Sequence, residues 1–195
     1  IAHAVKDKSP TGVAHCHRRL SKALNEALRR RKISYNPIQF IKEPKITKKE
    51  LNTLSTEAVA RLLDYVRENE SMYYHIVHTA LFTGMRRNEL LGLKWKDIDL
   101  DMSVIHVSRN IYRKHGVTIE QTPKTKAGRR SIDLTPTSAV LLRELLNWQM
   151  DNFQVTEESW VFRQSTGLPF LPDSVTHAFI RLAQRATIDN TLHGM

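Results

Sequence analysis

The chain has 195 residues, of which 41% are hydrophobic, and it carries a formal net charge of +10 and a single cysteine. This length and apolar content suffice for the core of one domain, or of one domain and part of another. The lone cysteine excludes an internal disulfide, and no stretch approaches the roughly 20 apolar residues of a membrane-spanning helix. The first ten residues lack the apolar run of a signal peptide, so we expect a soluble, cytoplasmic protein.

The positive charge is concentrated in the first quarter of the chain. Residues 1–50 contain 13 Lys and Arg against 4 Asp and Glu, whereas residues 51–195 contain 17 against 16. Two interpretations fit this excess: a segment that binds a polyanion such as nucleic acid, and a solvated helix face rich in Lys and Arg.

The first predicted element is a basic amphipathic helix over residues 18–31. Apolar residues recur in it at helical spacing, at Leu20, Leu24, Ala27 and Leu28. Its charge comes from Arg18, Arg19, Lys22, Arg29, Arg30 and Arg31. Asn36-Pro37 ends the helix, and "FIKEPKITKKE" at residues 40–50 predicts an exposed linker with a domain boundary near residue 45.

Two helices are predicted next, over residues 56–69 and 72–82. The second is apolar on most sides, so we expect it to be buried. His75 and His78 lie one turn apart on it, but no third ligand is near, which favours packing over metal binding. For the same reason the His-Cys-His run at residues 15–17 does not indicate a zinc site.

The periodicity of the apolar residues then changes, and strands are predicted at residues 103–107 and 129–134. The segment between them is strongly basic and has a turn at residues 126–128. Helices return at residues 137–152 and 172–186. These elements predict a mainly α fold with a small antiparallel β-sheet, of the α+β class.

The segment "FTGMRRNELLGLKWKDID", residues 82–99, is the most informative. Gly84 breaks the buried helix, Arg86 and Arg87 follow, and a second apolar helix is predicted to begin at once. An arginine at the first turn of a helix suits phosphate binding, and Glu89 is placed to hold one guanidinium. The alternative is a purely structural pair of Arg86 and Glu89 within the fold.

Residues 83–93, "TGMRRNELLGL", followed by Trp95, Asp97 and Asp99, resemble the first signature box of the tyrosine recombinases, the phage integrase family. "EQTPKTKAGRRSIDL", residues 120–134, is similar to the β-hairpin of that family that carries an active-site lysine. The resemblance assigns this role to Lys124, with Lys126 as the competing candidate.

The resemblance also implies a domain organisation. Residues 1–43 correspond to the last part of a helical core-binding domain that clamps DNA, residues 44–52 to a linker, and residues 53–195 to a catalytic domain without its C-terminal part. The DNA contacts would then come from the six basic residues of the first helix and from Lys45, Lys48, Lys126 and Arg129.

The chemistry that the resemblance implies needs no metal and no cofactor. In this family a tyrosine attacks a DNA phosphate and forms a 3′-phosphotyrosine link, while a 5′-hydroxyl leaves. Arg86 would stabilise the transition state, Lys124 would protonate the leaving oxygen, and His193 would open the His-x-x-Arg box of the family.

The second arginine of that box and the nucleophilic tyrosine would follow Met195. The five tyrosines, Tyr35, Tyr65, Tyr73, Tyr74 and Tyr112, are expected to be packing or surface residues. We therefore predict that this chain alone does not cleave DNA.

The resemblance implies double-stranded DNA with attachment sites as the partner, a tetramer on DNA when the protein is full length, and a place at the nucleoid in the bacterial cytoplasm. Two alternatives remain open. One is a non-catalytic, truncated DNA-binding module that occupies recombination sites or regulates an intact integrase. The other is a relative of the type IB topoisomerases, although the segment at residues 83–95 is closer to the integrase pattern.

Overall fold

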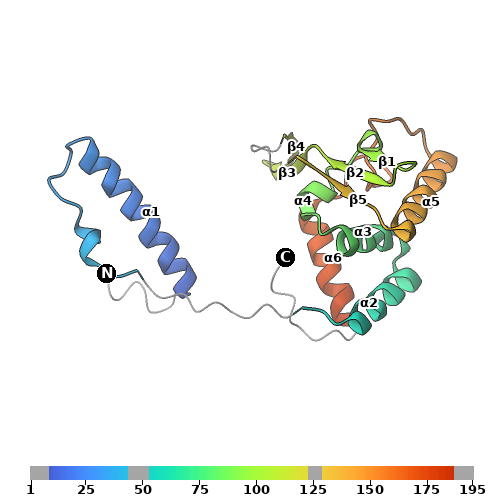
Figure 1. Ribbon diagram of the computed structural model, residues 1–195, viewed down its shortest axis with the longest axis horizontal. Helices are drawn as coiled ribbons and strands as arrows, with labels where there is room; N and C mark the ends of the chain where they lie inside the picture. Colours follow the sequence, from blue (N-terminus) through green and yellow to red (C-terminus); the bar gives the residue numbers. More distant parts are fainter. Residues whose placement is uncertain (1–8, 44–52, 123–128, 187–195) are drawn as a thin grey trace. The chain divides into compact units, whose positions relative to one another are not determined.

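The computed structural model describes residues 9–43, 53–122 and 129–186. The chain divides into two compact units, Ile1–Leu51 and Asn52–Met195, and each is described by itself (Figure 1). Within the three described ranges, no helix combines the length and apolar character that a membrane crossing requires.

The first unit is built around one helix, α1 (Pro10–Arg29). This helix begins well before residue 18, where the apolar periodicity predicted its start. Ser9 caps it by accepting a hydrogen bond from the N–H of Gly12 at 3.2 Å, and Pro10 takes the first helical position. These local signals extend the helix beyond its periodic part.

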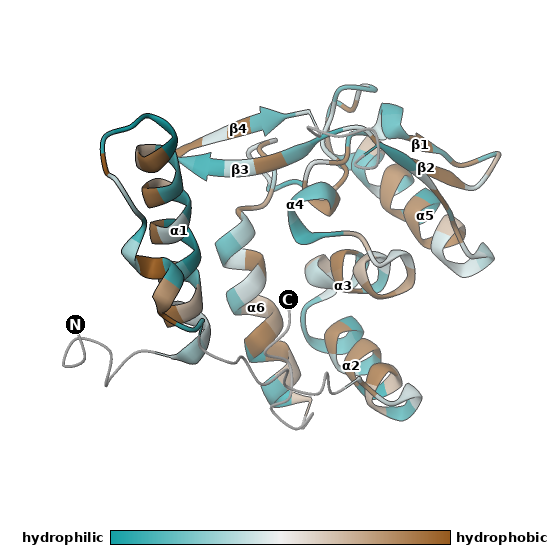
Figure 2. Cartoon of the chain, turned by 60° about the vertical axis from the view of Figure 1, so that its left-hand side comes forward, coloured by the Kyte–Doolittle hydropathy of each residue, from teal (hydrophilic) through white to brown (hydrophobic). Residues whose placement is uncertain are grey.

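The chain returns along α1 through a short 3₁₀ turn, η2 (Pro37–Phe40). The fully buried Asn36 fixes this turn, because its amide donates to Asn25 Oδ1 at 2.7 Å and its Oδ1 accepts from the N–H of Ile38 at 3.0 Å. Figure 2 shows α1 with an apolar and a polar side. The basic residues therefore lie on an amphipathic helix, of which Ala14 is buried in the described part of this unit while Leu20 is 53% exposed.

Four long helices frame the second unit: α2 (Thr56–Asn69), α3 (Ser71–Thr83), α5 (Pro136–Asn152) and α6 (Pro172–Arg185). Each lies within one residue of its predicted bounds at both ends. A small apolar cluster joins three of them, with Leu62 and Val66 from α2, Val77 from α3 and Leu182 from α6.

Two small antiparallel sheets accompany these helices. The first has the order β1 (Ile98–Asp99), β2 (Val104–Val107), β5 (Arg130–Asp133), and the second is a hairpin of β3 (Asn110–Lys114) and β4 (Val117–Gln121). β2 and β5 confirm the two predicted strands. The hairpin arises where only a basic segment was predicted, and His115 and Gly116, both with positive φ, form its two-residue turn.

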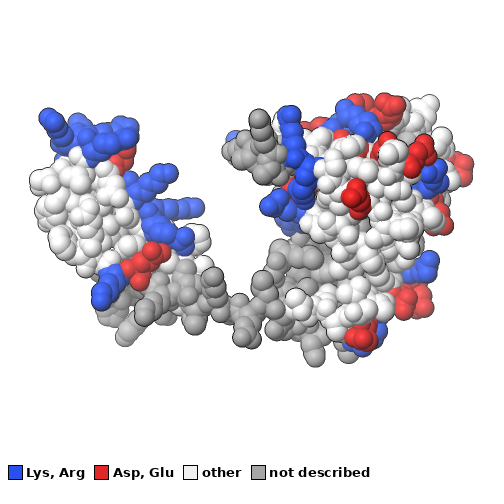
Figure 3. Space-filling model, viewed as in Figure 1, with Lys and Arg blue, Asp and Glu red and all other residues white. Residues whose placement is uncertain are grey.

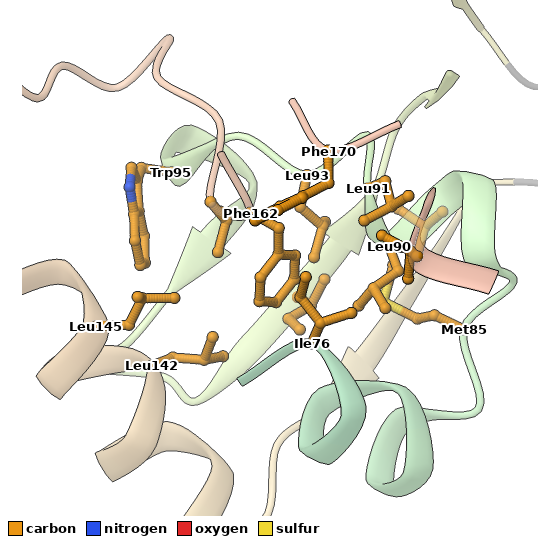
Figure 4. Close-up of a cluster of buried hydrophobic side chains, with 14 of the residues drawn as sticks. Ile76, Met85, Leu90, Leu91, Leu93, Trp95, Leu142, Leu145, Phe162 and Phe170 are labelled. Carbon is orange, nitrogen blue, oxygen red and sulfur yellow. The ribbon is translucent and has the colours of Figure 1, made fainter. Parts of the chain in front are cut away.

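The main core of the second unit lies between α3, α5 and the first sheet (Figure 4). Ile76 of α3, Leu142 of α5 and Phe162 are each at most 3% exposed. Ile105 of β2 is fully buried in the same cluster. This core supports the segment from Met85 to Leu93, whose buried side chains enter it.

The helix predicted after Gly84 is present, but it is short and ends at Leu90. The structure has a single helical turn, α4 (Arg87–Leu90), followed by the 3₁₀ turn η3 (Trp95–Asp97). At Gly92 an added Cβ would lie 3.1 Å from the carbonyl oxygen of Asn88 and 3.3 Å from Asn110 Cα. The start of β3 thus crosses the chain directly after α4, and the helix ends there.

Candidate active site

The turn after α3 brings Arg86 to the surface. Gly84 has a left-handed φ of 60° and ends the helix. Thr83 Oγ1 donates to the carbonyl of Thr79 at 2.5 Å and accepts from the N–H of Met85 at 3.4 Å. Because Met85 is buried in the core, the chain is held there and the next side chain, Arg86, is 76% exposed.

The side chain of Glu89 connects Arg86 to the first sheet. Its carboxylate accepts hydrogen bonds from the backbone N–H of Arg86 at 3.1 Å and from Arg86 Nη1 at 2.9 Å. It also accepts two bonds from Arg130 on β5, at 2.8 Å from Nη2 and 3.2 Å from Nη1. One carboxylate, 7% exposed, thereby fixes two guanidinium groups from different elements.

These contacts set the charge of the cluster. Burial alone would raise the pKa of Glu89, but the hydrogen bonds from Arg130 and Arg86 outweigh it, so that this pKa lies below its ordinary value. The bonds to Glu89 in turn raise the pKa of Arg130 above its ordinary value. The cluster therefore holds two positive charges against one negative charge at neutral pH.

This arrangement suits an anion at the exposed guanidinium. The arginine side chain carries five N–H donors, and the guanidinium of Arg86 makes a single contact with the carboxylate, through Nη1, so most of its donors are free to meet a ligand. A cation fixed before the ligand arrives needs little rearrangement to bind a phosphate. Because α4 is one turn long, the predicted contribution of a helix N-terminus is small, and the side chain supplies the positive charge.

A hollow of about 640 Å³ lies beside Arg86, between α3, α4 and α6. Ile76, Val77, Val175 and Phe179 give it a largely apolar lining, while Arg86 and Arg87 lie on it from α4. An extended ligand bound at Arg86 would therefore have apolar surface next to its charged group.

A second ion pair supports the chain just beyond α4. Arg109 pairs with the buried Asp97, and Ser108 Oγ donates to Asp97 Oδ1 at 2.7 Å. The backbone N–H of Lys94 donates to Asp97 Oδ2 at 2.8 Å. This network connects η3 to the segment leading into β3, and it holds the hairpin against the turn at Gly92.

Lys and Arg gather on one edge of the second unit (Figure 3). That edge carries α4 and the β3–β4 hairpin, where Arg86 before α4 and Arg113 and Lys114 on β3 are exposed. Acidic residues lie mainly elsewhere on the visible face of this unit. The near-neutral second unit therefore has a positive edge, and Arg86 is part of it.

Residues 52–194 match the profile described as the phage integrase family. The chain belongs to the phage integrase family. This family is that of the tyrosine recombinases, which are enzymes that break and rejoin DNA.

Curated relatives of this integrase-family chain act in bacteria. It is 33% identical to the shufflon-specific DNA recombinase of Escherichia coli over 101 residues, which cover 52% of this chain and 25% of that protein. It is 27% identical to the ICEBs1 integrase of Bacillus subtilis over 130 residues, 67% of this chain and 34% of that protein. The chain thus spans only a quarter to a third of the length of these relatives.

Solved structures share the integrase fold. The Tn1549 transposon integrase in complex with transposon right end DNA matches with a TM-score of 0.80 at 23% identity, over 92% of this chain and 59% of that chain. Lambda integrase bound to DNA matches with a TM-score of 0.64 at 16% identity, over 95% and 60%. At such identities these matches concern the fold, and they agree with the predicted class of a mainly helical protein with small antiparallel sheets.

Several predicted site residues lie outside the described residues. These are Lys124 and Lys126 in the segment 123–128, His193 in the segment 187–195, and Lys45 and Lys48 in the segment 44–52. Among the predicted catalytic and supporting residues, the structure brings together Arg86 and Glu89. Arg129, predicted to contact DNA, is exposed directly before β5.

The basic residues predicted on the first helix differ in their contacts. Arg18 pairs with Glu43 at 3.2 Å, and Arg29 and Arg30 both pair with Glu26 at 2.6 Å. Each of these three side chains must give up its contact with a carboxylate before it can bind a phosphate. Within residues 9–43, the exposed side chains of Arg19, Lys22 and Arg31 have no carboxylate partner.

Arg130 is a residue of the cluster that the sequence reasoning missed. The strand pattern contained a usable signal, because side chains two apart on a strand share a face. Arg130 and Ile132 are both partly buried on β5, whereas Ser131 and Asp133 are exposed. A charged residue on the apolar face of a strand requires a partner, and Glu89 is that partner.

The five tyrosines have other surroundings. Tyr73 packs on Phe170 with ring centroids 5.6 Å apart, and Arg67 lies over the ring of Tyr74. Tyr65 packs against the apolar cluster of α2, α3 and α6, whereas Tyr112 is on β3 and Tyr35 belongs to the first unit. No tyrosine in the described ranges shares a hydrogen bond with Arg86, Glu89 or Arg130.

Proposed function

We propose that this chain is part of a DNA integrase or site-specific tyrosine recombinase of a phage or another mobile element, which cuts and rejoins DNA through a 3′-phosphotyrosine intermediate. The observation that carries this proposal is the exposed guanidinium of Arg86, fixed by the buried carboxylate of Glu89 within the segment that matches the family. A preorganised cation of this kind suits the negative charge that develops on a phosphate under attack.

The proposed reaction assigns one role to each group. A tyrosine oxygen attacks the phosphorus and forms a bond to it, while the bond from phosphorus to the 5′-oxygen breaks. Lys124 gives a proton to that leaving oxygen, and His193 assists proton transfer at the phosphate. Arg86 stabilises the added negative charge, and Glu89 keeps its guanidinium in place.

The nucleophilic tyrosine and the second arginine are proposed to lie beyond these 195 residues. The chain spans 25% and 34% of two relatives, which leaves ample length for both groups. The packing of Tyr65, Tyr73 and Tyr74 among helices argues against a nucleophile among them. On this basis, the 195 residues alone bind DNA without cleaving it.

The substrate is proposed to be double-stranded DNA with attachment sites. The solved Tn1549 and lambda integrases were both bound to DNA, and the basic α1 and the positive edge of the second unit suit the same polyanion. Residues 1–43 would act as the last part of a core-binding domain, 44–52 as a linker and 53–195 as the catalytic domain. The full-length protein would assemble as a tetramer on DNA in the bacterial cytoplasm.

The proposal can be tested with the native full-length protein and a nicked suicide duplex that traps the covalent intermediate. We expect a protein–DNA adduct whose rate falls by a factor on the order of 100 in Arg86→Ala, because one transition-state donor is lost. Arg143→Ala is a matched control, because Arg143 is an exposed arginine on α5 whose contacts are with Asp101 and the carbonyl of Leu100 and not with Glu89.

An undiminished adduct in Arg86→Ala would remove that residue from the mechanism. If the full-length protein binds DNA but forms no adduct, the alternative stands: a non-catalytic module that occupies recombination sites or regulates an intact integrase. Equal loss in Arg86→Ala and Arg143→Ala would show a general charge effect instead.

A further inference from the structure

Arg87, the neighbour of Arg86, bridges α4 and α6. Its Nη1 donates to Thr176 Oγ1 at 2.5 Å and lies 3.7 Å from Asp173 Oδ1, while its Nε donates to Asn88 Oδ1 at 3.2 Å. Thr176 lies in the first part of α6 and is 89 positions away along the chain. One guanidinium therefore connects the turn that carries Arg86 to a helix from the other end of the domain.

The rest of α6 is held differently. Leu182 packs in the apolar cluster with α2 and α3, and Arg181 pairs with Glu70, which directly precedes α3, at 2.7 Å. By contrast, Val175 and Phe179 line the hollow of about 640 Å³ beside Arg86. Val175 is nevertheless only 8% exposed and packs in the main core, so the contact of Arg87 adds a polar link to α4 beside this apolar packing.

The geometry of this bridge favours arginine. Thr176 Oγ1 donates its own proton to the carbonyl of Pro172 at 3.1 Å, so that its lone pairs are available to the guanidinium. The planar fork of Arg87 reaches Asn88 on one side and Thr176 on the other. A lysine ammonium at the same place cannot span both acceptors in this fixed geometry.

We propose that Arg87 is a positioning residue of the integrase reaction. It holds the first turns of α6 at a fixed distance from Arg86, while the pair of Arg181 and Glu70 holds the later turns. The same contact fixes the turn that carries Arg86 against α6, and with it the place of the Arg86 guanidinium at the phosphate; this step rests on the function proposed above.

The bridge itself can be tested without DNA. In the full-length protein, hydrogen exchange of the amides of residues 176–179 should become roughly fivefold faster in Arg87→Ala, as expected for one lost side-chain hydrogen bond. Thr176→Val, which removes the acceptor at nearly constant shape, should have the same effect. Unchanged exchange in both variants would overturn the bridge.

The catalytic consequence needs a second measurement. With the suicide duplex, Arg87→Ala and Thr176→Val should lower the rate of adduct formation by roughly 10- to 100-fold, because small misplacements of reacting groups are costly. The dissociation constant for the same DNA should change by less than about threefold, a loss that one phosphate contact would exceed at low salt. Arg87→Lys should resemble Arg87→Ala.

Arg181→Gln serves as the control, because it also removes an ion pair of α6 but leaves the contact with α4 intact. It should destabilise the protein with a smaller loss of adduct rate than Arg87→Ala. Weak DNA binding in Arg87→Ala that Arg87→Lys restores would overturn the proposal and make Arg87 a phosphate contact. If the unaltered protein forms no adduct, the proposed function fails, whereas the exchange data still decide whether Arg87 holds α6.

Discussion

The carboxylate of Glu89 receives two hydrogen bonds from the guanidinium of Arg130, at 2.8 and 3.2 Å, although 41 positions separate them in the sequence. The same carboxylate binds Arg86. Strand β5 and the turn after α3 thus meet at one buried acid. A substitution at Glu89 therefore affects both the stability of the fold and the position of the Arg86 guanidinium.

Replacement of Glu89 should destabilise the protein. Glu89→Gln keeps the shape but removes the charge that compensates Arg130 and Arg86, and we expect a loss of about 2–4 kcal/mol in the free energy of unfolding. Urea denaturation measures this loss. Glu158→Gln, which affects an exposed acid paired with Lys94 and Lys96, is the control and should cost much less. Equal losses would mean that burial of Glu89 has no special effect.

The pair of Arg109 and Asp97 should be among the most sensitive in the second unit, because the two side chains are only 14% and 6% exposed. Asp97→Asn leaves Arg109 without its counter-charge, and a loss of about 3–5 kcal/mol is expected in denaturant unfolding. Asp101→Asn also removes the partner of an arginine, but at a side chain that is 91% exposed, so it should cost less than about 1 kcal/mol. A similar cost for both would contradict the inferred role.

Stability should fall in mild acid because of His78. Its burial, beside the rings of Tyr74 and Phe82, lowers its pKa, and the charges of His75 and Arg67 act in the same direction. The unfolded chain then takes up the proton at about pH 6.5 while the folded protein still resists it. This contribution to stability is complete above that pH and is lost as the pH falls through the lower folded-state pKa.

The matching measurement is urea unfolding between pH 7.5 and pH 5. His78→Phe should reduce the pH dependence without abolishing it, since the aromatic ring remains but no longer titrates, while His75, whose pKa burial also lowers, still does. His177→Gln, at an exposed position on α6, should keep the slope of the unaltered protein. A slope that survives His78→Phe unchanged would assign the effect to other groups.

The free basic side chains of α1 should govern the salt dependence of DNA binding. Each phosphate contact contributes about one unit to the slope of log affinity against log salt concentration. Arg19→Ala should therefore reduce that slope by about one in the full-length protein. Arg29→Ala should reduce it less, because Arg29 is already paired with Glu26. Equal reductions would mean that DNA displaces Glu26 at no cost.

The four long helices of the second unit were predictable because their signals are local. Apolar spacing and caps such as Ser55 before α2 and Thr135 before α5 act within a few residues. The single turn of α4 was not predictable, because it ends where β3 crosses Gly92, and that crossing depends on residues far away in the sequence.

In the candidate site, too, the contacts between neighbouring residues were predictable and those between distant residues were not. Arg86 and Glu89 are three positions apart, so a helical turn suggests their pairing. The contact of Glu89 with Arg130 requires the pairing of β2 with β5, and the contact of Arg87 with Thr176 requires the docking of α6. Such partners emerge only once the tertiary structure brings the elements together.

The close crossing at Gly92 also gives the β3–β4 hairpin a fixed length. Asn110, the first residue of β3, touches the turn after α4, and the ribbon then extends over four further residues to Lys114. At about 3.4 Å per residue, its basic tip lies roughly 14 Å from that anchor. The hairpin therefore holds its basic tip at a fixed distance from Gly92. One residue inserted into each strand would move the tip by about 3.4 Å.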